Sequence, residues 1–293
     1  ENRNTFKAVA EEWIEARLSQ RSATYRDQVE RAFKRDVYPK LGRLPMREVT
    51  AALVLDVLRV MDGRGATTLA LQVRQWISAV FRFGVATLRA DADPAAALKG
   101  AVVRKAVNHS KPMTLEQLRE YYAAVDKYKG HRVTVIALQL LPMLFTRTVE
   151  LRCARWDEFD LDAAVWEIPA ERMKMRRKHL VPLPVQAVEL LRELRRITPG
   201  ELCFPGLVSP DKPLSPTTLN RALEYLSMDG WHCHDFRATA STHLYESGQW
   251  RGEVIELQLA HAERNKVRAA YNHAQYLDER RQMMQFWVRL ILK

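Results

Sequence analysis

Residues 100–113, GAVVRKAVNHSKPM, interrupt an otherwise helical pattern and constrain the fold more than any other segment. The segment is basic, contains Asn, Ser and Pro, and has no amphipathic period, which is typical of a linker. We expect a domain at 1–100, a linker at 101–112 and a second domain at 113–293, a division that a chain of 293 residues can accommodate. An ordinary surface loop at this place is the alternative.

The first hundred residues predict a compact set of helices. Apolar residues recur at helical spacing in TFKAVAEEWIEARL, where they are Phe6, Val9, Trp13 and Leu18. The next segment, SATYRDQVERAFKRDVYP, has a Ser or Thr cap and a predicted stop at Pro39–Gly42. Two further helices are expected in residues 50–65 and 66–90, and the spacing of the aromatic residues in the second indicates a core: Trp76, Phe81 and Phe83.

The second half is predicted to be mainly helical with one small antiparallel sheet. TLEQLREYYAAVDKY and HRVTVIALQLLPMLF have helical patterns. DEFDLDAAVWEIP and KHLVPLP are short β-prone segments on either side of the basic turn AERMKMRRK. Helices are expected again up to the end of the chain, after a connection rich in Pro and Gly at TPGELCFPGLVSPDKPLSPTT. The predicted fold class is therefore mainly α with a small β-sheet in the second domain.

Charge indicates a polyanionic partner. The formal net charge is +11 and the sequence pI is about 9.7. Residues 1–111 hold 20 Lys and Arg against 12 Asp and Glu, whereas residues 112–293 hold 26 against 23. A front half this basic favours nucleic acid as the partner.

Cysteines and termini indicate a reducing compartment. Cys153, Cys203 and Cys233 are too far apart for a CxxC zinc pattern, and their odd number argues against a disulfide framework. ENRNTFKAVAEEW lacks the apolar core of a signal peptide, and the longest apolar run, VTVIALQLLPMLF, is too short to span a bilayer. We expect a cytoplasmic, nucleoid-associated protein without a membrane partner. Because residue 1 is Glu and not Met, we also expect an upstream portion to be missing.

Six functional side chains are spread over the second half: Arg147, Lys174, His234, Arg237, His261 and Tyr271. Each alone has an ordinary explanation, such as a helix ion pair between Arg147 and Glu150. Together they supply what cleavage of a phosphodiester without a metal requires. Paired guanidinium groups neutralise the nonbridging oxygens, an acid protonates the leaving alkoxide, and a tyrosine provides the nucleophile.

The order of these residues and their flanking segments resemble the tyrosine recombinase (phage integrase) family. TRTVELRCARWDEFDLDAAVWEIPAERMKMRRKHLVPL is similar to the first catalytic box and β-hairpin of integrases from satellite phages, prophages and genomic islands. HDFRATASTHL and LAHAERNKVRAAYNHAQYLDERRQMMQFW resemble the second box and the nucleophile helix of that branch. Residues 1–100 resemble its helical core-type DNA-binding domain, so the resemblance covers essentially the whole chain.

The resemblance implies a role for each residue. Arg147 and Arg237 would clamp the scissile phosphate, and Lys174 on the hairpin turn would protonate the 5′-hydroxyl leaving group. His234 would assist proton transfer and His261 would bind a phosphate oxygen. Tyr271 would form a 3′-phosphotyrosine link, and Glu150 would orient the pocket. One departure is Val149, which stands where many relatives have Gly or Ser.

Two local ambiguities remain. In WHCHDFRATASTHLYESG, His234 and Arg237 lie three residues apart on a helix expected to begin near Cys233, with Phe236, Ala240 and Leu244 anchoring the adjacent face. His232, Cys233 and His243 are then neighbours, and a metal site at HCH is disfavoured because alternating residues diverge at a helix start. Tyr276 and Tyr245 are the alternatives to Tyr271 as nucleophile. The apolar stripe of the last helix (Met284, Trp287 and Ile291) would pack either on its own domain or, as the family implies, on a neighbouring protomer.

The family reading implies a two-domain clamp around double-stranded DNA at core-type attachment sites, and a homo-tetramer that exchanges strands through a Holliday junction. A directionality factor and a host DNA-bending protein are possible partners, and no metal, nucleotide or organic cofactor is implied. Candidate DNA contacts are the basic residues Arg26, Arg31, Lys34, Arg35, Arg74, Arg176 and Arg177. Relatives carry a further N-terminal domain for arm-type sites. The alternatives are a type IB topoisomerase and a DNA-binding protein of the same fold that has lost catalysis.

Overall fold

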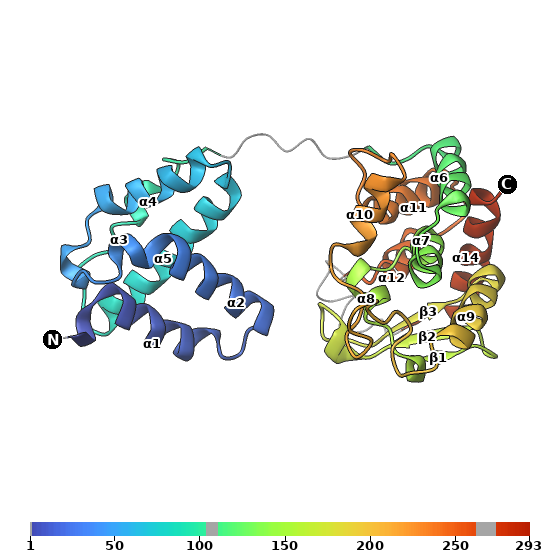
Figure 1. Cartoon of the computed structure of the whole chain (residues 1–293), viewed down its shortest axis with the longest axis horizontal. Helices are drawn as coiled ribbons and strands as arrows, with labels where there is room; N and C mark the ends of the chain where they lie inside the picture. The colour runs from blue at the N-terminus through green and yellow to red at the C-terminus, as the bar shows by residue number, and fades with distance from the viewer. Residues whose placement is uncertain (1, 104–110, 262–273) are drawn as a thin grey trace. The chain divides into compact units, whose positions relative to one another are not determined.

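The computed structural model describes residues 2–103, 111–261 and 274–293. The chain divides into two compact units (Figure 1), one from Glu1 to Asn108 and the other from His109 to Lys293. Each unit has its own hydrophobic core. The division lies inside the range predicted for the linker, 101–112, of which 104–110 lies outside the described residues.

The described part of the first unit consists of helices, turns and loops. Its elements are η1 (Asn2–Asn4), α1 (Phe6–Leu18), α2 (Ala23–Ala32), the π-helical turn η2 (Phe33–Val37), α3 (Tyr38–Leu41), η3 (Met46–Glu48), α4 (Ala51–Gly63), α5 (Thr67–Ala86) and η4 (Ala96–Leu98). Polar caps begin three of the helices, because the hydroxyls of Thr5, Ser22 and Thr50 accept hydrogen bonds from backbone amides in the first turns of α1, α2 and α4.

The core of this unit is aromatic. The predicted stripe of α1 is buried, as are Trp76 and Phe81 on α5, which confirms those predictions. Phe33 packs against the rings of Phe6 and Trp76 at the centre. Phe83 is only half-buried, and the guanidinium of Arg89 lies 5.5 Å from its ring centroid, so this residue forms the rim of the core.

The predicted helix stop at Pro39–Gly42 is confirmed, because the helical backbone ends at Leu41 with Gly42 as its C-cap. The amide of Tyr38 bonds to the carbonyl of Phe33 across a π-helical turn, and a new helix begins at Tyr38. Pro39 therefore lies in the first turn of α3, where its missing N–H has no intrahelical partner to lose.

The second unit surrounds a small sheet with helices. Its elements are α6 (Leu115–Lys127), α7 (Arg132–Leu144), α8 (Thr148–Arg152), η5 (Trp156–Glu158), β1 (Phe159–Asp160), β2 (Val165–Ile168), η6 (Ala170–Arg172), β3 (His179–Pro182), α9 (Val185–Ile197), α10 (Thr218–Tyr225), α11 (Asp235–Glu246), α12 (Gly252–Gln258) and α14 (Leu277–Ile291). The fold class is therefore mainly α with a small antiparallel sheet, as predicted.

The sheet has the order β1-β2-β3 with antiparallel pairing throughout. Ile168 pairs with His179 and Val165 with Pro182, so the two strands enclose the basic segment 169–178 as a long turn. Trp166 is completely buried on one face of β2, and its indole N–H donates to Glu158 at 2.9 Å. The turn with Lys174 is therefore held at one end of a well-packed hairpin.

The longest apolar run, which has a helical pattern, forms α7, and its apolar side chains are buried. Within the described ranges, no helix is long and apolar enough to cross a membrane.

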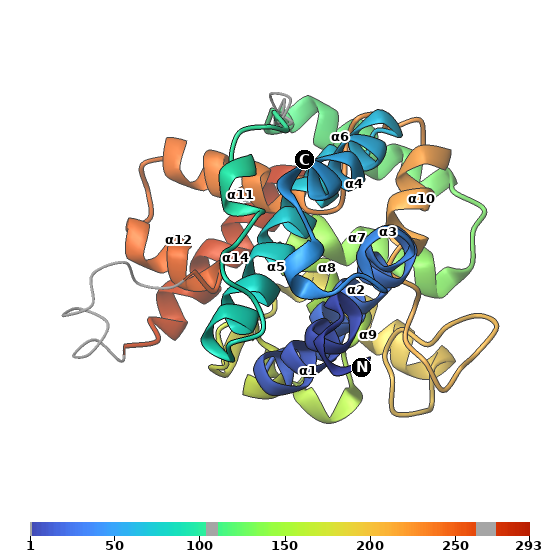
Figure 2. The same cartoon turned by 90° about the vertical axis from the view of Figure 1, so that its left-hand side faces the viewer.

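The stripe of the last helix packs inside its own unit. Met284, Trp287 and Ile291 are fully buried, and α14 contacts α6, α7, α12 and β3. The indole N–H of Trp287 donates to the carbonyl of Pro142 on α7 at 2.8 Å. The alternative prediction, that this stripe packs on a neighbouring protomer, is therefore wrong, because α14 fills the core between α7 and β3. Figure 2 shows α14 beside α12, which in turn packs on α11.

Candidate active site

Arg237 is the best-buried of the predicted phosphate ligands, with 5% of its surface exposed. It lies in the first turn of α11, which the apolar face formed by Phe236, Ala240 and Leu244 holds in the core as predicted. Its Nη1 donates to the carbonyl of Phe145 and its Nη2 to the carbonyl of Leu259, both at 2.6 Å. These two residues are the C-caps of α7 and α12, so the guanidinium binds the negative ends of two helices.

Burial is the main cause that lowers the pKa of Arg237 to about 10, and the neighbouring charge of Arg147 lowers it further. The group remains cationic at neutral pH. A cation that is desolvated in this way interacts strongly with an anion, because little water screens it.

Arg147 precedes α8 and shares its surroundings with Glu150. Nη1 of Arg147 lies 2.7 Å from Glu150 Oε1, and the backbone amide of Arg147 donates to Oε2 at 2.8 Å. Glu150 is 2% exposed and therefore fixes both the backbone and the guanidinium. Nη2 of Arg147 also contacts the carbonyl of Ala260 at 3.4 Å, so both arginines bind the end of α12.

His234 stands at the start of α11, one residue before the helix, which begins at Asp235. Burial lowers its pKa, and the charges of Arg237, Arg147 and His261 act in the same direction. Arg147 and Arg237 bind the adjacent carbonyls of Ala260 and Leu259, which precede His261, and His234 lies three residues before Arg237. The fold therefore brings four of the six, Arg147, His234, Arg237 and His261, into one cationic cluster.

His261 follows α12 and is held by Glu256. Its Nδ1 lies 2.7 Å from Glu256 Oε2, and its backbone amide bonds to the carbonyl of the same residue at 3.0 Å. The hydroxyl of Tyr245 donates to the other carboxylate oxygen at 3.1 Å. A carboxylate is an acceptor only, so Nδ1 carries a proton, and Nε2 can donate to a phosphate oxygen when the ring holds a second proton.

The positions of the three candidate nucleophiles differ. Tyr271 lies outside the described residues. Burial and the neighbouring Glu256 raise the pKa of Tyr245, which makes its hydroxyl a poor nucleophile. The ring of Tyr276 lies 4.4 Å below the guanidinium of Arg251.

Lys174, Arg176 and Arg177 are exposed on the turn before β3. No contact of the described residues joins Lys174 to the cationic cluster. Arg176 has a left-handed backbone, with φ of 53°, which turns the chain back toward β3.

The side chains of the HCH segment diverge, as expected for alternating residues at the start of a helix. His232 is exposed and lies 3.8 Å from Asp235, whereas Cys233 is buried and its amide donates to Asn220. Burial raises the pKa of the Cys233 thiol to about 12. His243 bonds to the carbonyl of Met113 at 2.8 Å from the other end of α11.

Four residues that support the site have no signal in the catalytic motifs: Arg172, His179, Gln258 and Arg280. Arg172 bonds to Glu158 and to the carbonyl of Glu150, which ties η6 to α8, the helix that follows Arg147. His179 Nε2 lies 3.2 Å from the carbonyl of Gln258, and Arg280 binds the Gln258 side chain. Glu256 was also missed, although its place five residues before His261 could have identified it.

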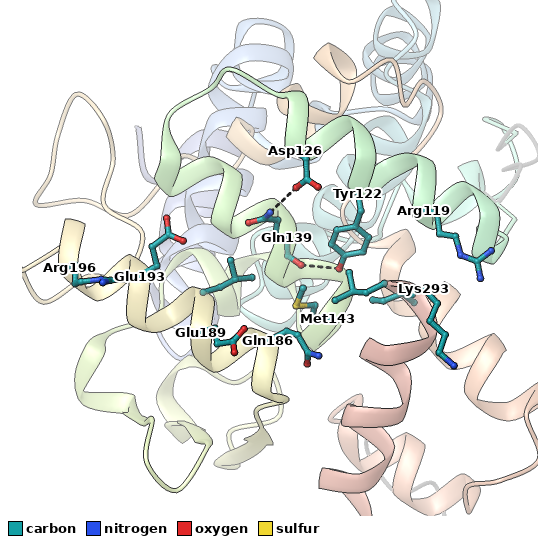
Figure 3. A pocket seen from close by; sticks show the side chains of 13 residues that line it. Arg119, Tyr122, Asp126, Gln139, Met143, Gln186, Glu189, Glu193, Arg196 and Lys293 are labelled. Carbon is teal, nitrogen blue, oxygen red and sulfur yellow. Dashed lines mark hydrogen bonds between the residues drawn. The ribbon is translucent and has the colours of Figure 1, made fainter.

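A cleft of about 570 Å³ lies elsewhere in the second unit, between α6, α7, α9 and the end of α14. Figure 3 shows its polar lining, where Gln139 bonds to Asp126 and Tyr122 to the backbone of Gln139. None of the predicted catalytic residues lines it. It is therefore separate from the cationic cluster.

In the first unit, a cleft of about 580 Å³ is lined by basic residues of α2 and η2, namely Arg31, Lys34 and Arg35, together with Gln28 and Leu69. Arg26 is engaged elsewhere, because it binds Glu15 and Glu30 at 2.7 and 2.8 Å. Arg74 donates to the carbonyl of Ala95 at 3.1 Å. On the cleft itself, Arg31 donates to the carbonyl of Asp27 and Arg35 to the carboxylate of Asp36, both at 3.1 Å, so lining the cleft does not separate these residues from those held by the protein itself.

Comparison with known proteins identifies relatives over nearly the whole chain. Residues 6–101 match the phage integrase central domain, and residues 111–277 match the phage integrase family. The integrase of Enterobacteria phage P4 is 37% identical over 97% of this chain and 68% of its own length. The prophage integrase IntZ of Escherichia coli K12 is 38% identical over 96% of this chain and 69% of its own length.

Solved structures share the fold. A lambda integrase dimer bound to a COC′ core site has a TM-score of 0.70 at 18% identity, covering 88% of this chain and 96% of that one. The Tn1549 transposon integrase in complex with circular intermediate DNA has a TM-score of 0.68 at 15% identity, covering 96% of this chain and 99% of that one. The two family matches and the integrases of phage P4 and Escherichia coli K12 show that the chain belongs to the phage integrase family and is a tyrosine site-specific recombinase.

Proposed function

We propose that Arg147, Lys174, His234, Arg237, His261 and Tyr271 form the active site of this recombinase. The hydroxyl oxygen of Tyr271 attacks the scissile phosphorus, a 3′-phosphotyrosine bond forms, and the bond to the 5′ oxygen breaks. His234 assists removal of the tyrosine proton, and Lys174 protonates the 5′ oxygen. Religation reverses these steps, so the bond energy is kept in the ester.

The two arginines and His261 would hold the nonbridging oxygens as charge develops in the transition state. The observation that carries this proposal is the shared attachment of Arg147 and Arg237 to the backbone at the end of α12. Groups fixed in this way are already oriented before DNA binds, so little free energy is lost in ordering them. Glu150 would keep Arg147 in place.

DNA binding would use both units. Arg31, Lys34 and Arg35 line a basic cleft, which supports phosphate binding by residues 1–100 as the core-binding domain. Arg176 and Arg177 flank Lys174 and would contact the backbone near the scissile bond. We further propose that residues 113–293 act as the catalytic domain, that the two domains clamp core-type attachment sites, and that four protomers exchange strands through a Holliday junction on nucleoid DNA. A directionality factor and a host DNA-bending protein stay predictions.

Covalent trapping tests the proposal. The parent chain and the variant Tyr271→Phe are incubated in EDTA with nicked suicide duplexes whose sequence around the nick is randomised, and adducts are separated on a denaturing gel. We expect a protein–DNA adduct with the parent chain only, and sequencing of the trapped strands would identify the preferred site. An adduct that persists in Tyr271→Phe would move the nucleophile to another residue, with Tyr276→Phe as the next variant.

A further inference from the structure

A buried cation on the last helix connects the catalytic elements. Arg280, in the first turn of α14, has no exposed surface. Burial lowers the pKa of its guanidinium to about 10, so it is still charged at neutral pH. No carboxylate among the described residues forms an ion pair with it, and its partners are a side-chain amide and backbone carbonyls.

These partners belong to three different segments. Nε and Nη2 of Arg280 donate to the side-chain oxygen of Gln258 at 3.0 and 2.7 Å. Nη2 also binds the carbonyl of Leu180 in β3. A longer contact of 3.5 Å joins Nη1 to the carbonyl of Gln275. One guanidinium therefore fixes α12, β3 and the start of α14 relative to one another.

A histidine closes the same network. Nε2 of His179 lies 3.2 Å from the backbone carbonyl of Gln258, and the ring is 6% exposed. His179 is the first residue of β3, five residues after Lys174. Gln258 is the last residue of α12 and precedes Leu259, whose carbonyl binds Arg237. The network thus lies between the end of the Lys174 turn and the segment that leads to His261.

Stability alone does not account for an arginine at this place. A buried ion carries a desolvation cost, and apolar residues of similar volume are often equally stabilising or better. What a guanidinium offers, and methionine does not, is a rigid fork of donors that fixes several acceptors at once. The arginine is therefore suited to setting geometry.

We propose that Arg280 is a positioning residue that holds the β3 end of the Lys174 turn against the end of α12, so that the general acid and the phosphate-binding groups meet at one phosphate. The inference rests on the function proposed above, because it takes Lys174 as the general acid. Arg280 is fully buried and is not proposed to touch DNA. It acts through Leu180 and Gln258.

A DNA substrate that needs no general acid separates positioning from a general loss of structure. When sulfur replaces the 5′ bridging oxygen, the leaving thiolate is stable without a proton, so cleavage no longer depends on Lys174. General acid catalysis contributes on the order of 10²–10⁴-fold. We therefore expect Arg280→Met to cleave normal DNA roughly 100-fold more slowly than the parent chain, and the sulfur-containing DNA nearly as fast as the parent. Lys174→Ala, which removes the proposed general acid itself, shows how large the selective rescue by sulfur is when no general acid is present.

Trp287→Phe is the matched control, since it alters another buried donor of α14 that bonds to Pro142 and packs on Phe145 at the end of α7, on the side of the Arg237 clamp and not of the Lys174 turn. We expect it to change cleavage of both substrates by the same factor. If Arg280→Met also slows both substrates equally, Arg280 only supports the fold and the inference is overturned. If Arg280→Met does not fold, Gln258→Met is the second variant. It removes the side-chain oxygen to which Arg280 donates, and it must show the same selective rescue on the sulfur-containing DNA. If the parent chain forms no adduct with either substrate, it is the proposed function that fails.

Discussion

Two hydrogen bonds converge on the carboxylate of Glu256, from His261 Nδ1 at 2.7 Å and from the Tyr245 hydroxyl at 3.1 Å. The first fixes the ring that is proposed to bind a phosphate oxygen. A hydrogen bond to a charged group contributes about 1.5–3 kcal/mol, so we expect Glu256→Ala to slow formation of the covalent adduct by roughly 10- to 100-fold. Single-turnover cleavage of a suicide duplex measures this rate.

Tyr245→Phe is the control for this prediction. It removes the hydroxyl that supports Glu256 but leaves the carboxylate next to His261, so the expected loss is only a few-fold. Equal losses in the two variants would contradict the idea that Glu256 acts directly on His261.

Burial of His179 predicts how stability depends on pH. Burial is the main cause that lowers its pKa to about 3, and the charges of Arg280, Arg237 and Arg147 act in the same direction. The unfolded imidazole titrates near pH 6.5, so below that pH the unfolded chain binds a proton that the folded chain excludes. The contribution of His179 to the free energy of unfolding is therefore complete above about pH 6.5. Below that pH the free energy of unfolding falls by up to about 1.4 kcal/mol per pH unit. The lowered pKa of His234 adds to this effect.

Urea unfolding of the parent chain and of His179→Gln, followed by circular dichroism between about pH 7.5 and about pH 5, measures this dependence. Glutamine keeps a donor for the Gln258 carbonyl without titrating, so we expect a shallower decrease in the variant. The same decrease in both proteins would assign the pH dependence to other groups.

At the level of elements, the C-terminus of α12 organises the site. The carbonyls of Gln258, Leu259 and Ala260 accept hydrogen bonds from His179, Arg237 and Arg147, which come from β3, α11 and the residue before α8. Terminal carbonyls of a helix have no partner within the helix, so they are available for such contacts. A seven-residue helix that would be marginal alone is stabilised here by the cations it orients.

The packing of α14 predicts a large effect on stability. Trp287 is fully buried against α7, so Trp287→Ala removes a ring from a closed core and is expected to lower the free energy of unfolding by about 3–5 kcal/mol. Gln282→Ala, at an exposed position on the same helix, should change it by less than about 0.5 kcal/mol. Urea unfolding compares the two. A loss below about 1 kcal/mol in Trp287→Ala would leave the stripe free for a partner.

At the scale of the whole molecule, the sequence was sufficient for the fold class, and it selected four residues that the fold brings together near the end of α12. Helical periodicity identified α1, α5 and α7, and the order of functional residues identified Arg147 and Arg237 because the chemistry demands those residue types. The partners of these residues were not predictable, since Arg280 bonds to Leu180 across 100 positions and Arg237 to Phe145 across 92. Such contacts depend on packing, which local patterns do not encode. For the same reason, helical periodicity predicted the apolar stripe on α14 but did not predict which elements pack against it.

Because the first unit is basic, we expect its affinity for DNA to fall as the salt concentration rises. The structure of this unit predicts which residues cause the salt dependence. Each phosphate neutralised adds about 0.9 to the slope of log affinity against log salt concentration. Lys34 lines the cleft on α2 and η2, whereas Arg26 already binds Glu15 and Glu30. We expect Lys34→Ala to reduce the slope by about 0.9. Arg26→Ala should leave it nearly unchanged, because Arg26 is already paired with two carboxylates, so its binding to DNA would release few counterions. Fluorescence anisotropy with a duplex of random sequence over a series of KCl concentrations measures both slopes. An equal reduction in both variants would mean that DNA displaces the carboxylates from Arg26, and no reduction in Lys34→Ala would place the DNA on another face of the first unit.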